Sequence, residues 1–563
     1  MEDYMQEKPW YKNYDEGVPT HLDYPKVPLY RLLEDAAKKC SEKTCTIFHD
    51  TVIQYHEMNE LTDRLAGAIA ALDVYKGDRV GILMPNIPQF VIAYFGILKA
   101  GGVVVAINPL YTPREIEYEV KDAGVKLMIV MSDYYDSIRN IQPRTSIRNI
   151  IVTHINDLSP RFSGIFSKLD KENEIGIKVQ LSERDFWLME LLKKHSPIER
   201  PKIEITDEDV AIFQYSGGTT GIPKGAIALH RNLIANSLEF REWMHIRKDG
   251  NEVVLIAIPL FHVYGMVVGM CLAIASGASM VLISDPRDID NILESIQKYS
   301  VTIYPGVPTM YVAINNHPDV IAGKYNLKTI KACISGSAPL MQETKIKFEQ
   351  LTGGKLVEGY GLSEAPTATH CNPLYKKNPL GSIGLPLPDI DAKIISLEDE
   401  VTEVPPLEVG ELVISGPLVF KEYHNMPTET EYTLRNGWLY TGDIARMDEE
   451  GFFYILDRKK ELIKPAGYQV WPREVEEIIS AHPNVFEVGV AGVPDSYRGE
   501  TVKAWIVPKP GETLTEQEIK DWCKERLANY KIPTQIEFRQ ELPKSTVGKI
   551  LRRELVREHQ ENE

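Results

Sequence analysis

The chain has 563 residues, of which 43% are hydrophobic and 25% are charged, and its formal net charge is −17. This composition is typical of a soluble globular protein, and the length predicts several domains. The acidic excess argues against a general binder of nucleic acid or of anionic membranes, although a small anionic ligand needs only a local basic site. The charged N-terminal segment has no apolar stretch of the signal-peptide type, so we expect a cytoplasmic protein.

The six cysteines are spread along the chain, and only Cys40 and Cys45 are close, at a spacing that fits no common zinc site. We predict reduced thiols that mostly fill the core. Residues 253–284 contain no Asp, Glu, Lys or Arg and would be long enough to span a bilayer. Because Pro259 and several glycines interrupt this stretch, we predict a buried strand, loop, helix and strand instead.

Short β-rich runs alternate with helical patterns from residue 79 to about residue 380, which predicts an α/β fold of helix-covered, mostly parallel sheets. From about 381 to 457, dense glycine and proline with hairpin-like strands predict a β-rich subdomain. A short charged segment, 458–460, is followed by a compact α+β pattern that includes a capped helix over 516–527. We therefore expect a large N-terminal domain (1–457), a hinge (458–460) and a small α+β C-terminal domain (461–563).

The stretch 214–226, QYSGGTTGIPKGA, has the composition of a phosphate-binding loop after an apolar strand. Its glycines allow backbone N–H groups to approach oxygens, and its hydroxyls and Lys224 add donors and charge. It is not a Walker A loop, because Lys224 follows Pro223 and no Ser or Thr comes after it. On this chemistry alone, a flexible surface turn stays open as the alternative to an anion site.

The segment YSGGTTGIPKG closely resembles the glycine- and threonine-rich loop of adenylate-forming enzymes, the superfamily of acyl-CoA synthetases, luciferases and adenylation domains. Four more segments resemble that superfamily in the same order: GYGLSEAP (359–366), GWLYTGDIA (437–445), DRKKELIKPAGYQVWPREVE (457–476) and PKSTVGKILRREL (543–555). The resemblance covers nearly the whole chain. It is strongest to long-chain fatty-acid–CoA ligases of the bacterial and archaeal type.

The resemblance implies a site for ATP and Mg²⁺. Glu364 is the implied Mg²⁺ ligand together with Thr219, since a hard cation prefers oxygen; outside its motif, such a Glu would be read as a solvated surface charge. Asp443 and Arg458 would hold the ribose hydroxyls, and Tyr360 would offer a face to adenine. The full implied set of nucleotide-binding residues is Ser216, Gly217, Gly218, Thr219, Thr220, Gly221, Lys224, Gly336, Ser337, Ala338, Pro339, Glu358, Gly359, Tyr360, Gly361, Leu362, Ser363, Asp443, Ile455 and Arg458.

The resemblance also implies a mobile C-terminal domain that turns between two half-reactions. Lys549 would enter the site for adenylation, while the loop with Lys464, Gly467 and Tyr468 would serve CoA and thioester formation, with Lys460 at the hinge. His262 and Lys464 join Lys549 and Glu364 as expected catalytic residues, although a lone His in apolar surroundings is usually a core residue. The expected acyl pocket comprises His262, Val263, Gly265, Val307 and Gly361. Lys544, Arg552 and Arg553 are interpreted as a solvated basic helix face.

We expect an ATP-dependent fatty acyl-CoA synthetase that forms acyl-AMP and pyrophosphate, then acyl-CoA and AMP, with medium- to long-chain fatty acids preferred. An aryl-CoA ligase or another adenylate-forming enzyme stays as the alternative. A peptide-synthetase module is disfavoured because no carrier domain follows residue 549. A P-loop kinase is disfavoured by the loop spacing, and a non-catalytic binder by the presence of both lysines and Glu364. The sequence leaves open whether the protein contacts a membrane surface or forms a homodimer.

Overall fold

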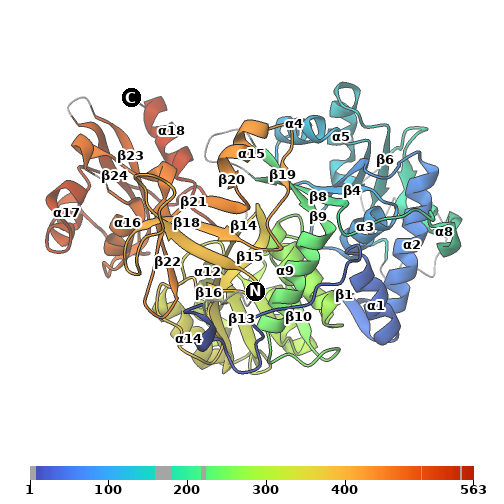
Figure 1. Cartoon of the computed structure of the whole chain (residues 1–563), viewed down its shortest axis with the longest axis horizontal. Coiled ribbons are helices and arrows are strands. Elements are labelled where there is room, and N and C mark those ends of the chain that lie inside the picture. Colours follow the sequence, from blue (N-terminus) through green and yellow to red (C-terminus); the bar gives the residue numbers. More distant parts are fainter. Residues whose placement is uncertain are drawn as a thin grey trace, which may run out of the picture.

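The computed structural model describes residues 8–158, 179–216, 223–468, 470–495, 498–545 and 548–562. Within these ranges it has two large sheets, a five-stranded sheet and a three-stranded C-terminal sheet. In Figure 1 the C-terminal elements, drawn in orange to red, lie at one end of the molecule beside the five-stranded sheet. The expected α/β class is confirmed.

An eight-stranded sheet has the order β19-β9-β8-β4-β3-β5-β6-β7. Its strands are β3 (Arg79–Leu83), β4 (Val103–Ala106), β5 (Leu127–Met131), β6 (Asn149–Thr153), β7 (Phe186–Trp187), β8 (Val210–Ser216), β9 (Lys224–Leu229) and β19 (Glu422–Tyr423). The pairs from β8 to β7 are parallel, whereas β8–β9 and β9–β19 are antiparallel. Runs of Val, Ile and Leu suit the parallel strands because both faces of the sheet are covered.

A nine-stranded sheet has the order β16-β15-β14-β13-β12-β10-β11-β1-β2. Its strands are β1 (Thr44–Phe48), β2 (Thr51–Gln54), β10 (Val253–Ile256), β11 (Ser279–Leu282), β12 (Ile303–Gly306), β13 (Ala332–Ser335), β14 (Lys355–Leu362), β15 (Ala365–Cys371) and β16 (Leu385–Pro386). The central pairs are parallel and both ends are antiparallel. The antiparallel β14–β15 hairpin carries the GYGLSE segment at its tip.

Helices cover these sheets and fill the space around them. They are α1 (Arg31–Lys39), α2 (Tyr55–Ala71), α3 (Pro88–Lys99), α4 (Pro113–Ala123), α5 (Tyr135–Ile141), α8 (Leu188–Lys194), α9 (His230–Trp243), α10 (Leu272–Ala275), α11 (Ile289–Tyr299), α12 (Pro308–Asn316), α13 (Pro318–Ile321) and α14 (Gln342–Thr352). The residues at the two ends of helix α4 show why this helix begins and ends where it does. Thr112 and Glu115 form a capping box ahead of Pro113, and Gly124 ends the helix in the left-handed region at φ 63°.

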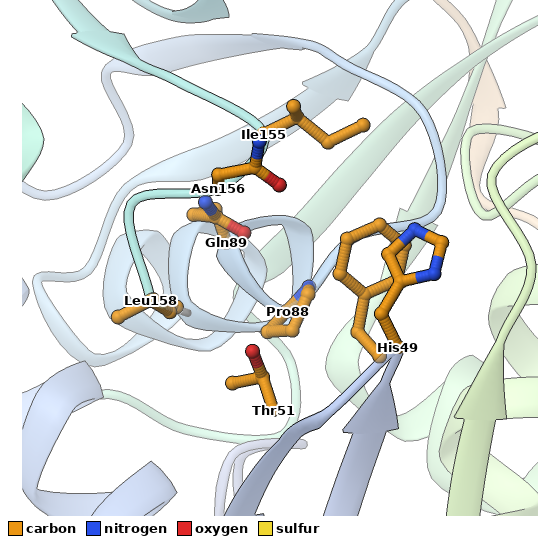
Figure 2. A pocket seen from close by; sticks show the side chains of 8 residues that line it. His49, Thr51, Pro88, Gln89, Ile155, Asn156 and Leu158 are labelled. Atoms are coloured by element: carbon orange, nitrogen blue, oxygen red, sulfur yellow. The ribbon is translucent and has the colours of Figure 1, made fainter. Parts of the chain in front are cut away.

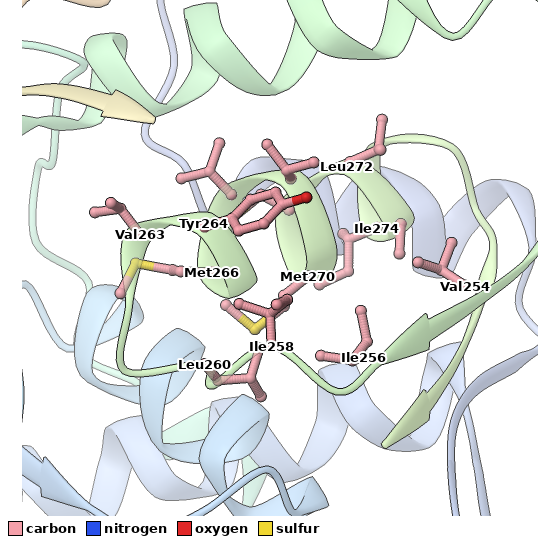
Figure 3. Packing of buried hydrophobic residues seen from close by; sticks show 14 of the residues in the cluster. Val254, Ile256, Ile258, Leu260, Val263, Tyr264, Met266, Met270, Leu272 and Ile274 are labelled. Atoms are coloured by element: carbon pink, nitrogen blue, oxygen red, sulfur yellow. The ribbon is translucent and has the colours of Figure 1, made fainter. Parts of the chain in front are cut away.

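The uncharged stretch 253–284 folds as predicted, into β10, a loop, a helical segment and β11. The helical segment begins as a π-helix, η5 (Tyr264–Cys271), which the sequence did not predict, and continues as α10. Figure 3 shows Met270 of this segment near Ile256 and Ile258, and all three side chains are buried. Across the described part of the chain, no helix is both long and apolar enough to cross a membrane.

The five-stranded sheet is the predicted β-rich subdomain. It comprises β17 (Asp391–Ile395), β18 (Gly410–Ser415), β20 (Leu434–Arg435), β21 (Trp438–Met447) and β22 (Phe453–Arg458), with α15 (Pro427–Thr433) before β20. The C-terminal part pairs β23 (Val485–Asp495) with β24 (Gly499–Pro508) and β24 with β25 (Gln535–Phe538). Around that sheet lie α16 (Pro472–Ser480), α17 (Glu516–Lys524) and α18 (Arg552–Asn562).

Helix α17 and the cysteines bear on two local predictions. Helix α17 has the predicted Thr515–Glu518 capping box but ends at Lys524 rather than at residue 527. All six cysteines are free, and five of them are buried, in agreement with the predicted thiol fillers. The charged segment at 458–460 lies where β22 ends and a short 3₁₀ turn, η6 (Lys459–Glu461), begins. The exact domain limits stay a prediction.

Candidate active site

Asp443 and Arg458 face each other across the β21–β22 hairpin, where they are register partners. The Asp443 Oδ1 atom lies 2.6 Å from Arg458 Nε, and its Oδ2 atom accepts a 2.5 Å hydrogen bond from the Tyr360 hydroxyl. The Asp443 carboxylate raises the pKa of Arg458, and burial followed by Asp443 raises the pKa of Tyr360. Arg458 and Tyr360 therefore keep their usual protonation at neutral pH. The Asp443 carboxylate has lone pairs left for further donors such as a diol.

The glycine-rich loop connects two antiparallel strands. Ser216 ends β8, Lys224 begins β9, and the two are register partners. Gly217, Gly218, Thr219, Thr220 and Gly221 lie outside the described residues. A strand rather than a helix follows the loop, in keeping with the failed Walker spacing.

Helix α4 supports the end of this loop. The Tyr118 hydroxyl donates to the Pro223 carbonyl at 3.3 Å, and the Tyr215 hydroxyl donates to Asp122 Oδ2 at 2.6 Å. A side chain at Gly225 would lie 3.0 Å from the Tyr215 ring. Tyr118 and Tyr215 therefore hold the backbone in place where the loop joins β9.

Two residues that the sequence did not single out connect this loop to Glu364. The Tyr423 hydroxyl donates to Glu364 Oε1 at 2.6 Å, and the ammonium of Lys224 lies 5.3 Å from the centre of the Tyr423 ring. Lys224 also forms an ion pair with Glu429 of α15. The segment EYHNMPTETE resembled none of the motifs considered, so no sequence signal marked Tyr423 or Glu429.

The surroundings of Glu364 fit a magnesium ion that arrives with a nucleotide. Mg²⁺ is usually bound by one or two carboxylates together with substrate phosphates and water. Tyr423 fixes one carboxylate oxygen of Glu364, so the other can face a cation. Within the described residues no group of three or more His, Cys, Asp or Glu could hold a metal ion. The second expected ligand, Thr219, is outside the described residues.

Small residues line the ends of β13 and β14. Gly336, Ser337, Ala338 and Pro339 follow β13, and Ser337 adopts φ 70°. A side chain at Gly336 would lie 3.2 Å from the Tyr264 ring, and one at Gly361 would collide with the Thr367 carbonyl. Glycine is therefore required at 361 by the close approach of the backbone.

Glu358, Gly359 and Leu362 belong to β14, and Ser363 lies in the turn after it. Burial raises the pKa of Glu358 to about 7, although the charge of Arg473 opposes the rise. Arg473 donates through Nη1 to the carbonyl of Ile455 at 2.7 Å. Arg473, at the start of α16, thus acts on β14 through its charge and on β22 through a hydrogen bond.

His262 is partly exposed, and its Nδ1 accepts a 3.2 Å hydrogen bond from the backbone N–H of Tyr264. Desolvation lowers the pKa of His262 to about 4, so the ring is neutral at pH 7 and the geometry assigns its proton to Nε2. Val263 and Val307 are buried, and a side chain at Gly265 would collide with the Pro259 carbonyl. The Tyr264 hydroxyl donates to the Gly306 and Ile334 carbonyls at 3.1 and 2.8 Å, so the start of η5 lies against β12 and β13.

Lys549 is the C-terminal residue that the structure brings to this site. Its pKa is below that of an ordinary lysine because the ammonium is desolvated and, next, because Arg458 repels its charge. Asp443 acts on it in the opposite direction. A side chain at the preceding Gly548 would lie 3.0 Å from Thr309 Oγ1 and 3.9 Å from Val307 Cγ2, so this turn packs against the start of α12.

The other expected C-terminal residues lie elsewhere. The Lys464 N–H donates to Glu500 Oε2 at 2.9 Å, Gly467 ends a short 3₁₀ turn, and the Tyr468 ring stacks on Tyr530 at 4.7 Å. These contacts are internal to the C-terminal part. Lys460 is exposed in η6, within the segment expected to be the hinge.

The predicted solvated basic face is wrong for Arg552. Its guanidinium, 17% exposed, forms ion pairs with Asp457, Glu461 and Glu476. Lys544 pairs with Glu487. Three carboxylates from different segments converge on Arg552. The charges next to Arg552 in the sequence could not reveal these partners.

Two cavities lie away from these residues. The one in Figure 2 has a volume of about 20 Å³, and His49, Pro88 and Gln89 are among its lining residues. That volume holds a water molecule and no substrate. The other, of about 290 Å³, is lined by residues that include Lys76, Phe213 and His424. Neither cavity includes an expected site residue.

Comparison with known proteins gives matches along the whole chain. Residues 33–424 match the family model described as AMP-binding enzyme, and residues 474–549 match the AMP-binding enzyme C-terminal domain. A long-chain-fatty-acid–CoA ligase of Bacillus subtilis is 43% identical over 99% of this chain and 99% of its own. ATP-bound MatB of Rhodopseudomonas palustris superposes with a TM-score of 0.83 at 28% identity, covering 96% of this chain and 100% of MatB. Apo MatB, with the same identity and coverage, gives 0.73.

Proposed function

Since the chain belongs to the family of AMP-binding, adenylate-forming enzymes, we propose that it is an AMP-forming long-chain-fatty-acid–CoA ligase. The observation that carries this proposal is the 43% identity to such a ligase over 99% of both chains. The meeting of Asp443, Arg458 and Lys549, from two parts of the chain, supports it. The free state of all six thiols supports a cytoplasmic location.

In the first half-reaction, a fatty-acid carboxylate oxygen would attack the α-phosphorus of ATP. A C–O–P linkage forms, the bond to the β-phosphate oxygen breaks, and pyrophosphate leaves. Asp443, held by Arg458 and Tyr360, would accept hydrogen bonds from the ribose hydroxyls. Lys549 would place its positive charge on the α-phosphate, where negative charge increases in the transition state. Mg²⁺, when bound, would neutralise phosphate charge, with Glu364 and Thr219 as its ligands.

In the second half-reaction, the CoA sulfur would attack the acyl carbon and AMP would leave. We propose that residues 458–460 are the hinge between domains 1–457 and 461–563, and that rotation exchanges the Lys549 turn for the Lys464–Tyr468 loop. The hinge lies between the two family matches, which end at 424 and begin at 474. A dry wall formed by Val263, Gly265 and Val307, with neutral His262, would keep water from the acyl-AMP.

The test is incubation of the purified chain with ATP, Mg²⁺, CoA and palmitate. Release of AMP and pyrophosphate together with palmitoyl-CoA is the expected result, and ADP as the nucleotide product would overturn the proposal. A panel of acids from butyrate to stearate, with benzoate and 4-coumarate as aromatic acids, then tests the substrate class. A preference for the aromatic acids would favour the aryl-CoA ligase alternative.

A further inference from the structure

Lys224 begins β9 directly after the glycine-rich loop, and a carboxylate already binds its charge. The partner is Glu429, the third residue of α15, which comes from a segment 205 residues further along the chain. The Lys224 side chain is 15% exposed and that of Glu429 is 46% exposed. The lysine is thus fixed within the site while its partner can move toward solvent.

The position of Lys224 is set by groups that also set Glu364. Its ammonium lies over the Tyr423 ring, and the hydroxyl of the same ring is bound to Glu364. The backbone N–H of Tyr423 donates to Thr430 Oγ1 at 3.0 Å, which joins α15 to β19. Lys224, Tyr423 and Glu429 therefore form one unit at the phosphate side of the proposed site.

Glu429 has a second cation nearby. The pKa of its carboxyl lies below the ordinary value, first through the hydrogen bond and charge of Lys224 and then through the charge of Lys460 at the hinge. The carboxylate is therefore ionised at neutral pH. If Lys224 turns to another anion, Glu429 retains a positive neighbour and is not left as an isolated charge.

We propose that Glu429 is a displaceable counter-ion of Lys224, which yields the lysine to the pyrophosphate part of ATP and takes it back as pyrophosphate leaves. This inference rests on the proposed function. A carboxylate and a phosphate offer the same oxygen acceptors to an ammonium, so they compete for one position. Because partly exposed ion pairs are weak, the exchange costs little free energy. When Glu429 returns to Lys224, the lysine binds pyrophosphate less tightly, and pyrophosphate can leave.

Glu429 is accordingly a positioning residue, and its removal should tighten pyrophosphate binding. For E429Q we expect the dissociation constant of Mg-pyrophosphate, measured by calorimetry, to fall about fivefold, and the pyrophosphate inhibition constant to fall with it. The KM for ATP should fall about two- to threefold. If Glu429 only supported the fold, its removal would instead raise both pyrophosphate constants and the KM for ATP. E429D, which keeps the charge, should restore wild-type values.

E431Q is the matched control, because Glu431 is an exposed residue of the same helix and loses the same charge. Its pyrophosphate affinity should stay within twofold of wild type, which excludes a general electrostatic effect. In a K224M background, E429Q should have no further effect, as expected for a pair that acts together. E429A provides a second variant should E429Q fold poorly, and melting temperatures verify folding.

Unchanged or weaker pyrophosphate binding in folded E429Q and E429A would overturn the inference, as would an equal gain in E431Q. These binding measurements need no turnover. A wild-type chain that forms no AMP would overturn the proposed function by itself. Pyrophosphate affinity that does not respond to Glu429 in a chain that does form AMP would overturn only the role of Glu429.

Discussion

The turn around Lys549 and the loop around Lys464 both belong to the C-terminal part, yet they lie in different surroundings. Gly548 packs against Thr309, and Lys549 interacts with Asp443 and Arg458. Lys464, in contrast, donates its backbone N–H to Glu500 of its own part. Both lysines are exposed, so their partners rather than their burial distinguish them. We therefore propose that this arrangement is the one suited to adenylation rather than to thioester formation.

The backbone as a whole agrees with that interpretation. At equal sequence identity, the chain superposes better on the ATP-bound form of MatB than on its apo form. Because sequence similarity is the same in both cases, the difference reflects arrangement. Variants of the two loops should therefore affect different half-reactions.

The largest effect is expected for K549A. Loss of a charge aimed at the α-phosphate should slow acyl-AMP formation by about 10²–10³-fold. Conversion of supplied acyl-AMP and CoA to acyl-CoA should stay within about twofold of wild type, since that step would use the other face of the domain. Each half-reaction is measured separately, by pyrophosphate release without CoA and by AMP release from synthetic acyl-AMP. Equal loss in both steps would refute the separation.

A smaller and opposite effect is expected for K464A. Because Lys464 is held by Glu500 within the C-terminal part, its removal should leave acyl-AMP formation unchanged. The thioester step should slow about tenfold, the equivalent of one charged contact. K509A, which removes an exposed lysine of the same C-terminal part, is the control for loss of charge. A defect of K464A in acyl-AMP formation would contradict the assignment of the two loops to different half-reactions.

G548A tests the contact between the Lys549 turn and α12. Gly548 has φ 74°, and its added Cβ would meet Thr309, so adenylation should slow about three- to fivefold. Gly511 provides a matched control, because it has φ 83° and nothing within 4 Å of an added Cβ. G511A introduces the same backbone strain without the contact. Equal effects of the two variants would show that strain, rather than the contact with α12, is responsible.

Some features of the site and the fold could be predicted from the sequence, and others could not. The resemblance paired Asp443 with Arg458, and the two residues lie on neighbouring strands of one hairpin, at the end away from its turn. The thiols and the buried stretch 253–284 were also predictable, because burial follows from composition and punctuation.

The remaining contacts depend on tertiary placement. Lys224 and Glu429 are 205 residues apart, and no local period or turn relates them. Arg552 looked like part of a solvated face because the residues beside it in sequence are basic, whereas its partners come from β22, η6 and α16. Charge runs report only on neighbours along the chain, so they cannot reveal carboxylates that the fold brings in from elsewhere.

The smallest expected effect is a pH dependence that differs between the half-reactions. The pKa of Lys549 is lowered, so its ammonium loses the proton at a lower pH than an ordinary lysine, and its charge is fully present only well below that pKa. Acyl-AMP formation should therefore decline as the pH rises from 8 to 9.5, before an ordinary lysine would lose its proton. Thioester formation should hold or rise over this range, because the attacking thiol ionises and Lys549 would not take part. K549R, whose guanidinium stays protonated, should show a flat adenylation profile at its lower rate. Parallel profiles for the two steps in the wild type would mean that Lys549 does not distinguish them.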